Sequence, residues 1–318
     1  MVTTRVATRA SGIRRGDNFG NGPLASVLNL QRSKDRSAKC GIGAATRDWA
    51  RPGKTVLVDE TLLGGVANAG QVIRQGNSVL RPSNANSESI HAFLSALRAA
   101  GFIGASLPIE IQADGRERLA FLEGDVPIPP YPLWAQSREA LASIAFLLSE
   151  FHTASGLVSS HLSTWSNELA DPSGGSIVCH NDVCMENVVF RDGAAVGLLD
   201  FDFAAPGRPL YDLAQFARMC VPIDDDISAA RLGWQITDHP ARLRVVTEVY
   251  GLDKRARREF LECLDRSMNR GQDFVRRRVE AGDPNFIRMV EDMGGIERYE
   301  RRRSWWECRR ADFVAALQ

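Results

Sequence analysis

Residues 176–214 read SIVCHNDVCMENVVFRDGAAVGLLDFDFAAPGRPLYDLA, and this stretch decides the fold. Two strand-like apolar runs, 188–190 and 196–199, lie on either side of the pair Asp192-Gly193. Glycine adopts a positive φ without steric cost, so an Asp-Gly pair between apolar runs is typical of a β-hairpin turn. The sequence therefore predicts a hairpin over residues 188–199.

Polar side chains gather at the open end of this hairpin. Asn187 comes directly before the first run, and Asp200 comes directly after the second. His180, Asp182 and Asn187 stand in the order H-x-D-x-x-x-x-N, in a polar loop that follows a short apolar strand. We therefore expect Asp182, Asn187 and Asp200 to meet at one place.

These residue types suit phosphoryl transfer from a metal-bound nucleotide. That chemistry needs a carboxylate to orient the attacking hydroxyl and accept its proton, a role that Asp182 suits. It also needs hard oxygen ligands for Mg²⁺, which Asn187 and Asp200 offer. Asp202 either assists the metal or is solvated. His180 is expected to be a hydrogen-bonded structural residue, because Asp182 already occupies the position of the base.

The segments CHNDVCMENVVF and GLLDFDFAAPGRPLYDLA resemble the aminoglycoside phosphotransferase family, which includes choline-kinase-like enzymes. The resemblance covers about Val56 to the C-terminus. It implies an α+β, bilobal protein-kinase-like fold with a small β-rich N-lobe and a larger, mainly α C-lobe. It also implies ATP or GTP as donor, Mg²⁺, and a hydroxyl of a small molecule as acceptor.

Carried over by position, the resemblance makes Asp182 the base and Asn187 and Asp200 the metal ligands. Asp212 corresponds to an acid that braces the catalytic loop from the following helix. Protein kinases read D-F-G where this chain reads Asp200-Phe201-Asp202, which favours a small-molecule substrate.

The N-terminal half carries the expected nucleotide contacts. Gly64 and Gly65 are candidates for a loop over the phosphates, with an ordinary turn as the equal alternative. Arg81 stands where the family has a phosphate-contacting lysine. Either Glu88 or His91 pairs with Arg81, as the acid of the corresponding helix does in the family, or this helix face is solvated. By resemblance, Ala120 to Leu122 links the lobes and contacts the nucleotide base through its backbone.

Composition is that of an ordinary globular protein, with 44% hydrophobic residues and a net charge of zero over 318 residues. Residues 1–55 carry 11 basic and 3 acidic side chains, so the remainder is acidic. No apolar run reaches the length of a membrane span. The six cysteines form no C-x-x-C pair. Cys179, His180 and Cys184 lack a second ligand pair for zinc, and reduced thiols favour a cytoplasmic protein.

The chain divides into three expected parts. Residues 1–55 are predicted to be a disordered basic N-terminal tail. It is either a tail that contacts nucleic acid or anionic lipid, a targeting segment, or sequence upstream of the true start, which we favour. Residues 56–124 form the N-lobe and residues 125–318 the C-lobe, with acceptor-binding helices. Helices are predicted over the following ranges: 88–100, 133–151, 210–219, 241–250, 254–280 and 296–317.

Charged runs in the C-lobe have two interpretations. Asp224-Asp225-Asp226 either attracts a cationic acceptor or forms a solvated acidic loop, the interpretation we favour. The arginine runs 276–278 and 301–303 are expected to be solvated helix faces. We therefore expect no nucleic-acid partner and no membrane partner, only nucleotide and a small-molecule acceptor.

The alternative function is a non-catalytic, nucleotide-binding kinase-like protein that acts as a sensor or interaction module. Arg81 and the weak glycine loop favour that alternative, whereas the group Asp182, Asn187 and Asp200 favours catalysis. A protein kinase is disfavoured because no A-P-E-like segment follows.

Overall fold

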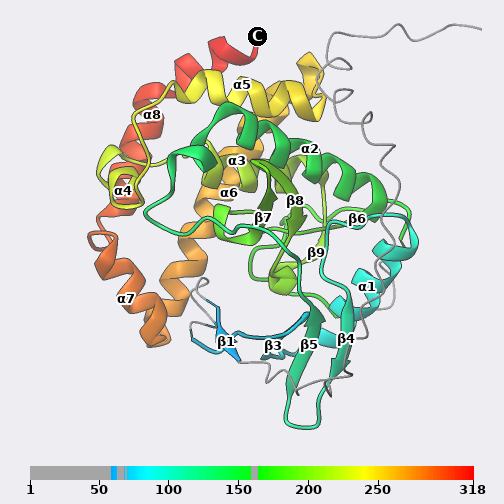
Figure 1. Ribbon diagram of the computed structural model, residues 1–318. Helices are drawn as coiled ribbons and strands as arrows, with labels where there is room; N and C mark the ends of the chain where they lie inside the picture. Colours follow the sequence, from blue (N-terminus) through cyan, green and yellow to red (C-terminus); the bar gives the residue numbers. More distant parts are fainter. Residues whose placement is uncertain (1–58, 63–67, 69, 159–163) are drawn as a thin grey trace, which may run out of the picture. The chain divides into compact units, whose positions relative to one another are not determined.

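The computed structural model describes residues 59–62, 68, 70–158 and 164–318 (Figure 1). The expected basic tail (1–55) and the expected phosphate loop at Gly64 and Gly65 lie outside the described residues. All of the structure described below belongs to one compact unit, Thr55–Gln318.

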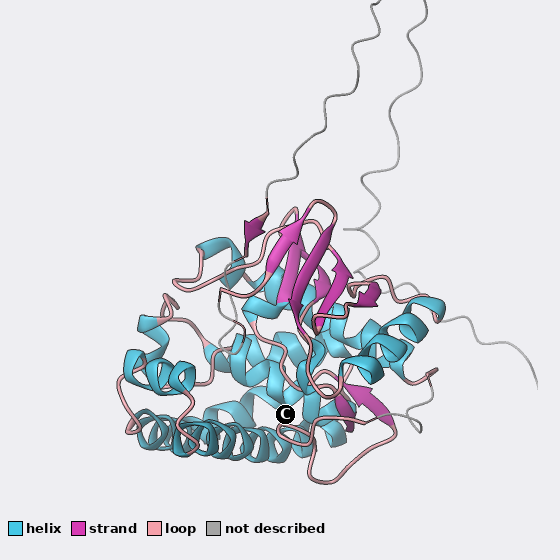
Figure 2. Ribbon diagram, turned by 90° about the horizontal axis from the view of Figure 1, so that it is seen from below, coloured by secondary structure: helices cyan, strands magenta, loops and turns pink. Residues whose placement is uncertain are grey.

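The N-terminal part is built around an antiparallel five-stranded sheet in the order β1-β2-β3-β5-β4. Its strands are β1 (Glu60–Thr61), β2 (Ile73–Gln75), β3 (Ser78–Pro82), β4 (Pro108–Ile111) and β5 (Arg116–Ala120). Helix α1 (Ser87–Ala99) connects β3 to β4 and buries Ile90, Phe93, Leu94 and Leu97. Figure 2 shows these strands gathered on one side of the helices that follow. This part is the expected β-rich lobe.

The middle of the chain contains two small antiparallel sheets. One pairs β6 (Ile177–Cys179) with β9 (Ala205–Gly207), and the other pairs β7 (Val188–Arg191) with β8 (Ala194–Leu198). Three short 3₁₀ segments accompany them: η2 (Leu133–Gln136), η3 (Met185–Asn187) and η4 (Phe201–Phe203).

The predicted hairpin over 188–199 is confirmed by the pairing of β7 with β8. Asp192 and Gly193 form its turn with φ values of 52° and 78°. A two-residue turn with two positive φ values matches the right-handed twist of the paired strands. The hairpin is also joined to the N-terminal part, because Ala105 bridges to Leu198 and Asp125 to Phe190.

The remainder is mainly helical, as expected. The long helices are α2 (Arg138–Ser155), α3 (Pro209–Cys220), α5 (His239–Tyr250), α6 (Lys254–Glu280) and α8 (Arg298–Leu317), with the shorter α4 (Asp226–Arg231) and α7 (Pro284–Asp292) between them. Helix α2 packs against α5, and α3 packs against α6. In the part of the chain that the structure describes, no helix is long and apolar enough to span a membrane.

Helix α2 forms the centre of the core. The apolar stripe predicted for it, Leu141, Ile144, Ala145, Leu148 and Phe151, is fully buried. The predicted start at Leu133 is wrong, since residues 133–136 are 3₁₀ and Ser137 caps the helix by accepting a hydrogen bond from the Ala140 N–H. The prediction for α6 matches its bounds, whereas α4 and α7 were not predicted.

Candidate active site

The hairpin brings Asn187 and Asp200 to one end. Asn187 is the last residue before β7, and Asp200 lies two residues beyond β8. The N–H of Leu199 donates to the carbonyl oxygen of Asn187 at 2.8 Å, which closes the end of the hairpin. Asp200 then takes a left-handed conformation with φ 60° and ψ 70°, which aspartate tolerates better than most residues. Backbone pairing alone therefore sets these two side chains close together.

Asp182 joins this pair through hydrogen bonds from the amide of Asn187. The Asn187 Nδ2 donates to the carbonyl oxygen of Asp182 at 2.9 Å and to its Oδ2 at 3.2 Å. The amide oxygen of Asn187 is thus left for another partner. Burial and the charge of Asp200 raise the pKa of Asp182 to about 8, against the opposing charge of Arg218. The sequence-predicted trio is therefore brought together.

Arg81, on β3, binds three carboxylates. It donates from Nε to Glu117 at 2.5 Å, from Nη1 to Asp200 Oδ1 at 2.7 Å and from Nη2 to Asp202 Oδ1 at 2.5 Å. Arg81 is 8% exposed. Burial disfavours its charge, but the three carboxylates raise its pKa above the usual value. Asp202 is accordingly held by arginine rather than solvated, and burial raises its own pKa to about 6.

Neither Glu88 nor His91 of α1 pairs with Arg81, so that interpretation is wrong, whereas the alternative of a solvated side chain holds for Glu88. The buried acid that holds Arg81 is Glu117, on the neighbouring strand β5, which lies directly opposite Arg81 in the strand register. His91 of α1 contacts Glu117 at 2.7 Å, so α1 supports the acid that binds Arg81. Glu88 faces solvent. Glu117 alternates with Arg116 and Arg118 along β5, and that inward-facing acid between outward arginines was the available sequence signal.

Asp212 holds the loop that carries Asp182. Its carboxylate accepts the backbone N–H of His180 at 2.7 Å, the N–H of Asn181 at 2.8 Å, and Nε2 of His152 at 2.9 Å. Burial alone would raise the pKa of Asp212, but the hydrogen bond and charge of His152 and the other donors hold it below the usual value. The expected bracing contact from α3 is present.

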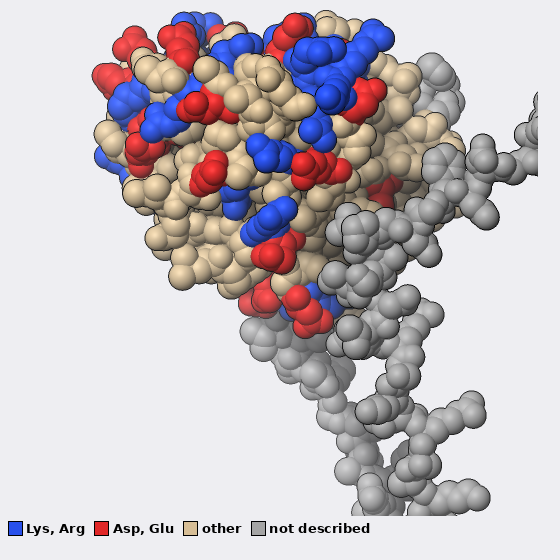
Figure 3. Space-filling view, turned by 90° about the horizontal axis from the view of Figure 1, so that it is seen from above, with Lys and Arg blue, Asp and Glu red and all other residues tan. Residues whose placement is uncertain are grey.

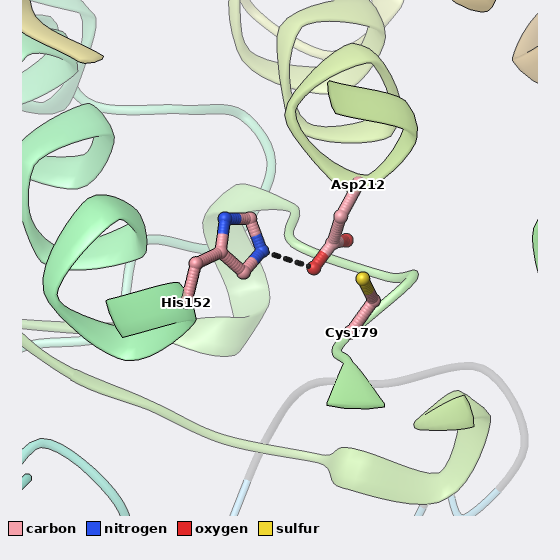
Figure 4. A group of neighbouring side chains, drawn as sticks. All are labelled: His152, Cys179 and Asp212. Carbon is pink, nitrogen blue, oxygen red and sulfur yellow. Dashed lines mark hydrogen bonds and ion pairs between the residues drawn. The ribbon is translucent and has the colours of Figure 1, made fainter. Parts of the chain in front are cut away.

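His152, Cys179 and Asp212 form a buried cluster of the kind that can hold a metal ion (Figure 4). Both ring nitrogens of His152 are already used, since Nδ1 contacts the hydroxyl of Tyr250 at 2.6 Å. Because Asp212 also accepts two backbone donors, this cluster is a hydrogen-bond network that supports the loop. His152 was missed from the sequence, where it is one histidine at the end of an apolar helix.

His180 is fully buried and contacts the far strand of the hairpin. Its Nε2 contacts the carbonyl oxygen of Leu199 at 2.8 Å, and the N–H of Asp182 donates to its Nδ1 at 3.3 Å. Burial lowers the pKa of His180, so the ring is neutral near pH 7. Its ring nitrogens are therefore engaged in fixing the loop.

A cavity of about 380 Å³ lies between the sheet and the hairpin. Apolar residues from the sheet and the segment after it line most of its wall, including Val72, Val79, Leu119, Phe121 and Leu122. Arg81, Asn187 and Asp200 lie at the polar part of the wall, and Asp182, which is not part of the wall, accepts a hydrogen bond from Asn187. Of the expected linker, Leu122 lines the cavity, whereas the N–H of Ala120 donates to Leu107 within the sheet. An apolar pocket with a few converging polar groups is typical of a ligand site.

The acidic run Asp224-Asp225-Asp226 is not a solvated loop, and that expectation is wrong for its first two residues. Asp224 and Asp225 are 8% and 5% exposed. Asp224 pairs with Arg298 and Asp225 with Arg301, both on α8. Trp305 donates its indole N–H to Asp226 at 2.9 Å. These acids hold α8 in place. For that reason neither the acidic run 224–226 nor the arginine run 301–303 is fully exposed to solvent.

Elsewhere the charges are mixed. Arg278 of α6 pairs with Glu168 at 2.6 Å, and Arg276 pairs with Asp273 on the same helix at 2.8 Å. On the face seen in Figure 3, basic and acidic side chains are interspersed.

Comparison with known proteins identifies the family. The model of the phosphotransferase enzyme family matches residues 160–246, the stretch that contains Asp182, Asn187, Asp200 and Asp212. The trifolitoxin immunity protein of Rhizobium leguminosarum bv. trifolii is 31% identical over 199 residues, 61% of this chain and 75% of that protein. The chain belongs to the phosphotransferase enzyme family.

Solved structures of the phosphotransferase family share the fold. The GDP complex of wild-type aminoglycoside 2′-phosphotransferase-IIIa is 15% identical, with a TM-score of 0.52, and the match covers 80% of this chain and 94% of that chain. The gentamicin complex of APH(2″)-IIa is 13% identical, with a TM-score of 0.51 and coverage of 74% and 90%. The expected α+β, bilobal protein-kinase-like fold is thereby confirmed.

Proposed function

We propose that this phosphotransferase moves the terminal phosphate of ATP or GTP to a hydroxyl group of a small molecule. The observation that carries the proposal is that Arg81, Asn187 and Asp200 line one cavity and that Asp182 accepts a hydrogen bond from Asn187. Two carboxylates, one amide and one fixed cation are the groups that this chemistry uses. In this proposal, residues 56–124 form the lobe that binds the nucleotide. Residues 125–318 form the lobe that holds the catalytic loop and the acceptor.

The donor atoms fit Mg²⁺. Asn187 uses its amide nitrogen toward Asp182, and Asp200 uses only Oδ1 toward Arg81. The Asn187 Oδ1 and the Asp200 Oδ2 therefore remain as hard oxygen ligands. Mg²⁺ bound there would neutralise phosphate charge. The acids that surround Arg81 also place negative charge next to this proposed Mg²⁺ site.

In the proposed reaction Asp182 orients the acceptor hydroxyl and takes its proton. The hydroxyl oxygen forms the new P–O bond, the bond from the terminal phosphorus to the bridging oxygen breaks, and the nucleoside diphosphate leaves with that electron pair. Asp212 and His180 keep the loop of Asp182 in place. Arg81 supplies positive charge for the phosphates from its position between the sheet and Asp200.

Two variants and a matched control test the proposal. Asp182→Asn should abolish nucleotide consumption with any acceptor but leave the melting-temperature rise with Mg²⁺ and nucleotide nearly intact. Asp200→Ala should remove that rise. Asp273→Asn, at an exposed carboxylate of α6, should change neither. Turnover that survives in Asp182→Asn would show that another group is the base.

The alternative, a nucleotide-binding sensor without transfer, gives a different pattern. It predicts that Mg²⁺ and nucleotide raise the melting temperature of wild type as before. With every acceptor of a panel, however, wild type should consume no more ATP or GTP than Asp182→Asn does. The panel should include aminoglycosides, amino alcohols, sugars and hydroxy acids, because the family fold is shared by enzymes with different acceptors.

A second candidate function is toxin immunity by phosphorylation, which the trifolitoxin immunity protein favours through its 31% identity. Expression of this chain in a trifolitoxin-sensitive strain should then restore growth, and Asp182→Asn should not. Growth restored equally by both chains would point to protection by binding instead of phosphate transfer.

A further inference from the structure

A second cavity, of about 410 Å³, is lined by residues of helices α6 and α8. It shares no lining residue with the cavity of the candidate active site. Its volume lies within the range of about 300–1,000 Å³ that is typical of pockets for small ligands. The proposed phosphate transfer uses none of the residues of this wall.

Arg302 of α8 is a buried cation in the wall of this cavity. It is the middle residue of the arginine run 301–303, yet it is only 5% exposed. A guanidinium has five N–H donors. Among the described residues, Arg302 makes one hydrogen bond, from Nη2 to the carbonyl oxygen of Met268 at 3.5 Å, and its Cζ lies 5.2 Å from the ring centroid of Tyr299. Most of its donors therefore lack a partner in the described part of the chain.

The charge of Arg302 is likewise left without an acid. Burial lowers the pKa of Arg302 to about 10, against the opposing charge of Asp224, so the guanidinium is still charged near pH 7. Asp224 itself is bound by Arg298, and Arg302 forms no ion pair with any described carboxylate. A buried charge is costly unless it is paired and hydrogen-bonded. An anion in the cavity would supply that partner.

The other charged residues of the wall do not supply it. The charged lining residues are three arginines and two acids: Arg302, Arg303, Arg310, Asp265 and Glu307. Asp265 already accepts the indole N–H of Trp306 at 2.6 Å and a guanidinium N–H of Arg310 at 3.1 Å. Arg303 and Glu307 are both exposed and offset each other in net charge. The excess positive charge of the wall is therefore that of the buried Arg302.

Neutral donors complete the wall. Asn269 and Gln272 of α6 line the cavity, and each side-chain amide offers two N–H donors. A phosphate group has three strong acceptor oxygens and carries about −1.5 to −2 charge at pH 7. Arginine binds phosphate through two parallel hydrogen bonds. The donors from the two helices thus correspond to those that a phosphate group needs, whereas a carboxylate would leave more of them unused.

On these grounds we infer that the cavity between α6 and α8 binds a phosphate group, either as inorganic phosphate or as part of a small phosphomonoester. Arg302 pairs with the phosphate from within the wall, and Arg303 adds charge at the exposed edge. A bound phosphate joins α6 to α8, because its donors come from both helices. This site is separate from the proposed transfer reaction and does not depend on it.

The test is calorimetric titration of the full chain with inorganic phosphate, glycerol 3-phosphate and acetate at constant ionic strength. At least one phosphate probe should bind about tenfold or more tightly than acetate. The tighter of the two phosphate probes shows whether the site takes free phosphate or a phosphomonoester. Acetate that binds as tightly as both would overturn the inference.

Variants locate the site. Arg302→Gln should weaken phosphate binding about tenfold or more, and Arg302→Lys should retain part of the affinity. Arg303→Gln, at an exposed residue of the same wall, should weaken it about threefold. Arg276→Gln, at an exposed arginine of α6 outside this wall, should leave it unchanged. If Arg302→Gln fails to fold, Arg303→Gln decides the question, and wild-type affinity in Arg303→Gln would then refute the site.

The nucleotide site is the other place where phosphate could bind. The titration is therefore repeated with Mg²⁺ and a saturating non-hydrolysable ATP analogue, which should leave phosphate binding unchanged. Phosphate displaced by the analogue would assign it to the active site and overturn the inference. Failure of the analogue to bind wild type would count against the proposed function instead, because phosphate is also titrated alone.

Discussion

Glu117→Ala is the perturbation that tests the buried network most directly. The Glu117 side chain is 1% exposed and receives hydrogen bonds from Arg81 at 2.5 Å and from His91 at 2.7 Å. Removing one partner of a buried ion pair costs about 3–5 kcal/mol when the other charge is left alone. Arg81 keeps Asp200 and Asp202, so we expect a smaller loss in the free energy of unfolding, about 2–3 kcal/mol.

For a unit of this size, each kcal/mol corresponds to roughly 2–4 °C in melting temperature, so the expected loss is about 5–10 °C. The matched control is Glu123→Ala, which removes the same side chain where it is 74% exposed and pairs with Arg74 at 3.4 Å. Exposed ion pairs contribute about 0–1 kcal/mol, so this variant should melt within about 4 °C of wild type. Scanning calorimetry and urea unfolding would measure both. Equal losses in the two variants would refute the network as a source of stability.

Three further predictions follow from single contacts. Asp182→Asn should raise the melting temperature, because the pKa of Asp182 in the folded state, about 8, lies above its unfolded value, so that wild type loses stability as the pH rises from about 4 to 8. The difference in melting temperature between Asp182→Asn and wild type should therefore widen over that pH range, and a constant difference would count against the raised pKa of Asp182. Gly193→Ala should cost about 1 kcal/mol in urea unfolding, because its φ of 78° strains any side chain although the space is open, whereas unchanged stability would mean that the turn relaxes. Asp212→Ala should lower both stability, by about 3 kcal/mol, and turnover, since it leaves two backbone N–H groups and His152 without their acceptor; stability retained with turnover lost would restrict Asp212 to positioning.

The sequence by itself determined the hairpin and the group at its end. Asp182, Asn187 and Asp200 lie within one short stretch, and local backbone pairing at an Asp-Gly turn is enough to bring them together. The long amphipathic helices were also predictable from local sequence, because apolar residues that recur every three or four positions indicate a helix with one buried face.

Only the tertiary structure decided the partners of buried charges. Arg81 is held by Glu117, 36 residues away, and by Asp200, 119 residues away. The alternation along β5 marks Glu117 as an inward-facing acid, but no local pattern pairs it with Arg81 in place of Glu88 or His91. The runs at 224–226 and 301–303 look solvated in sequence, yet Asp225 and Arg301 neutralise each other across 76 residues. Burial of a charge depends on which oppositely charged side chain the completed fold places beside it, and that information is absent from any single stretch of the chain.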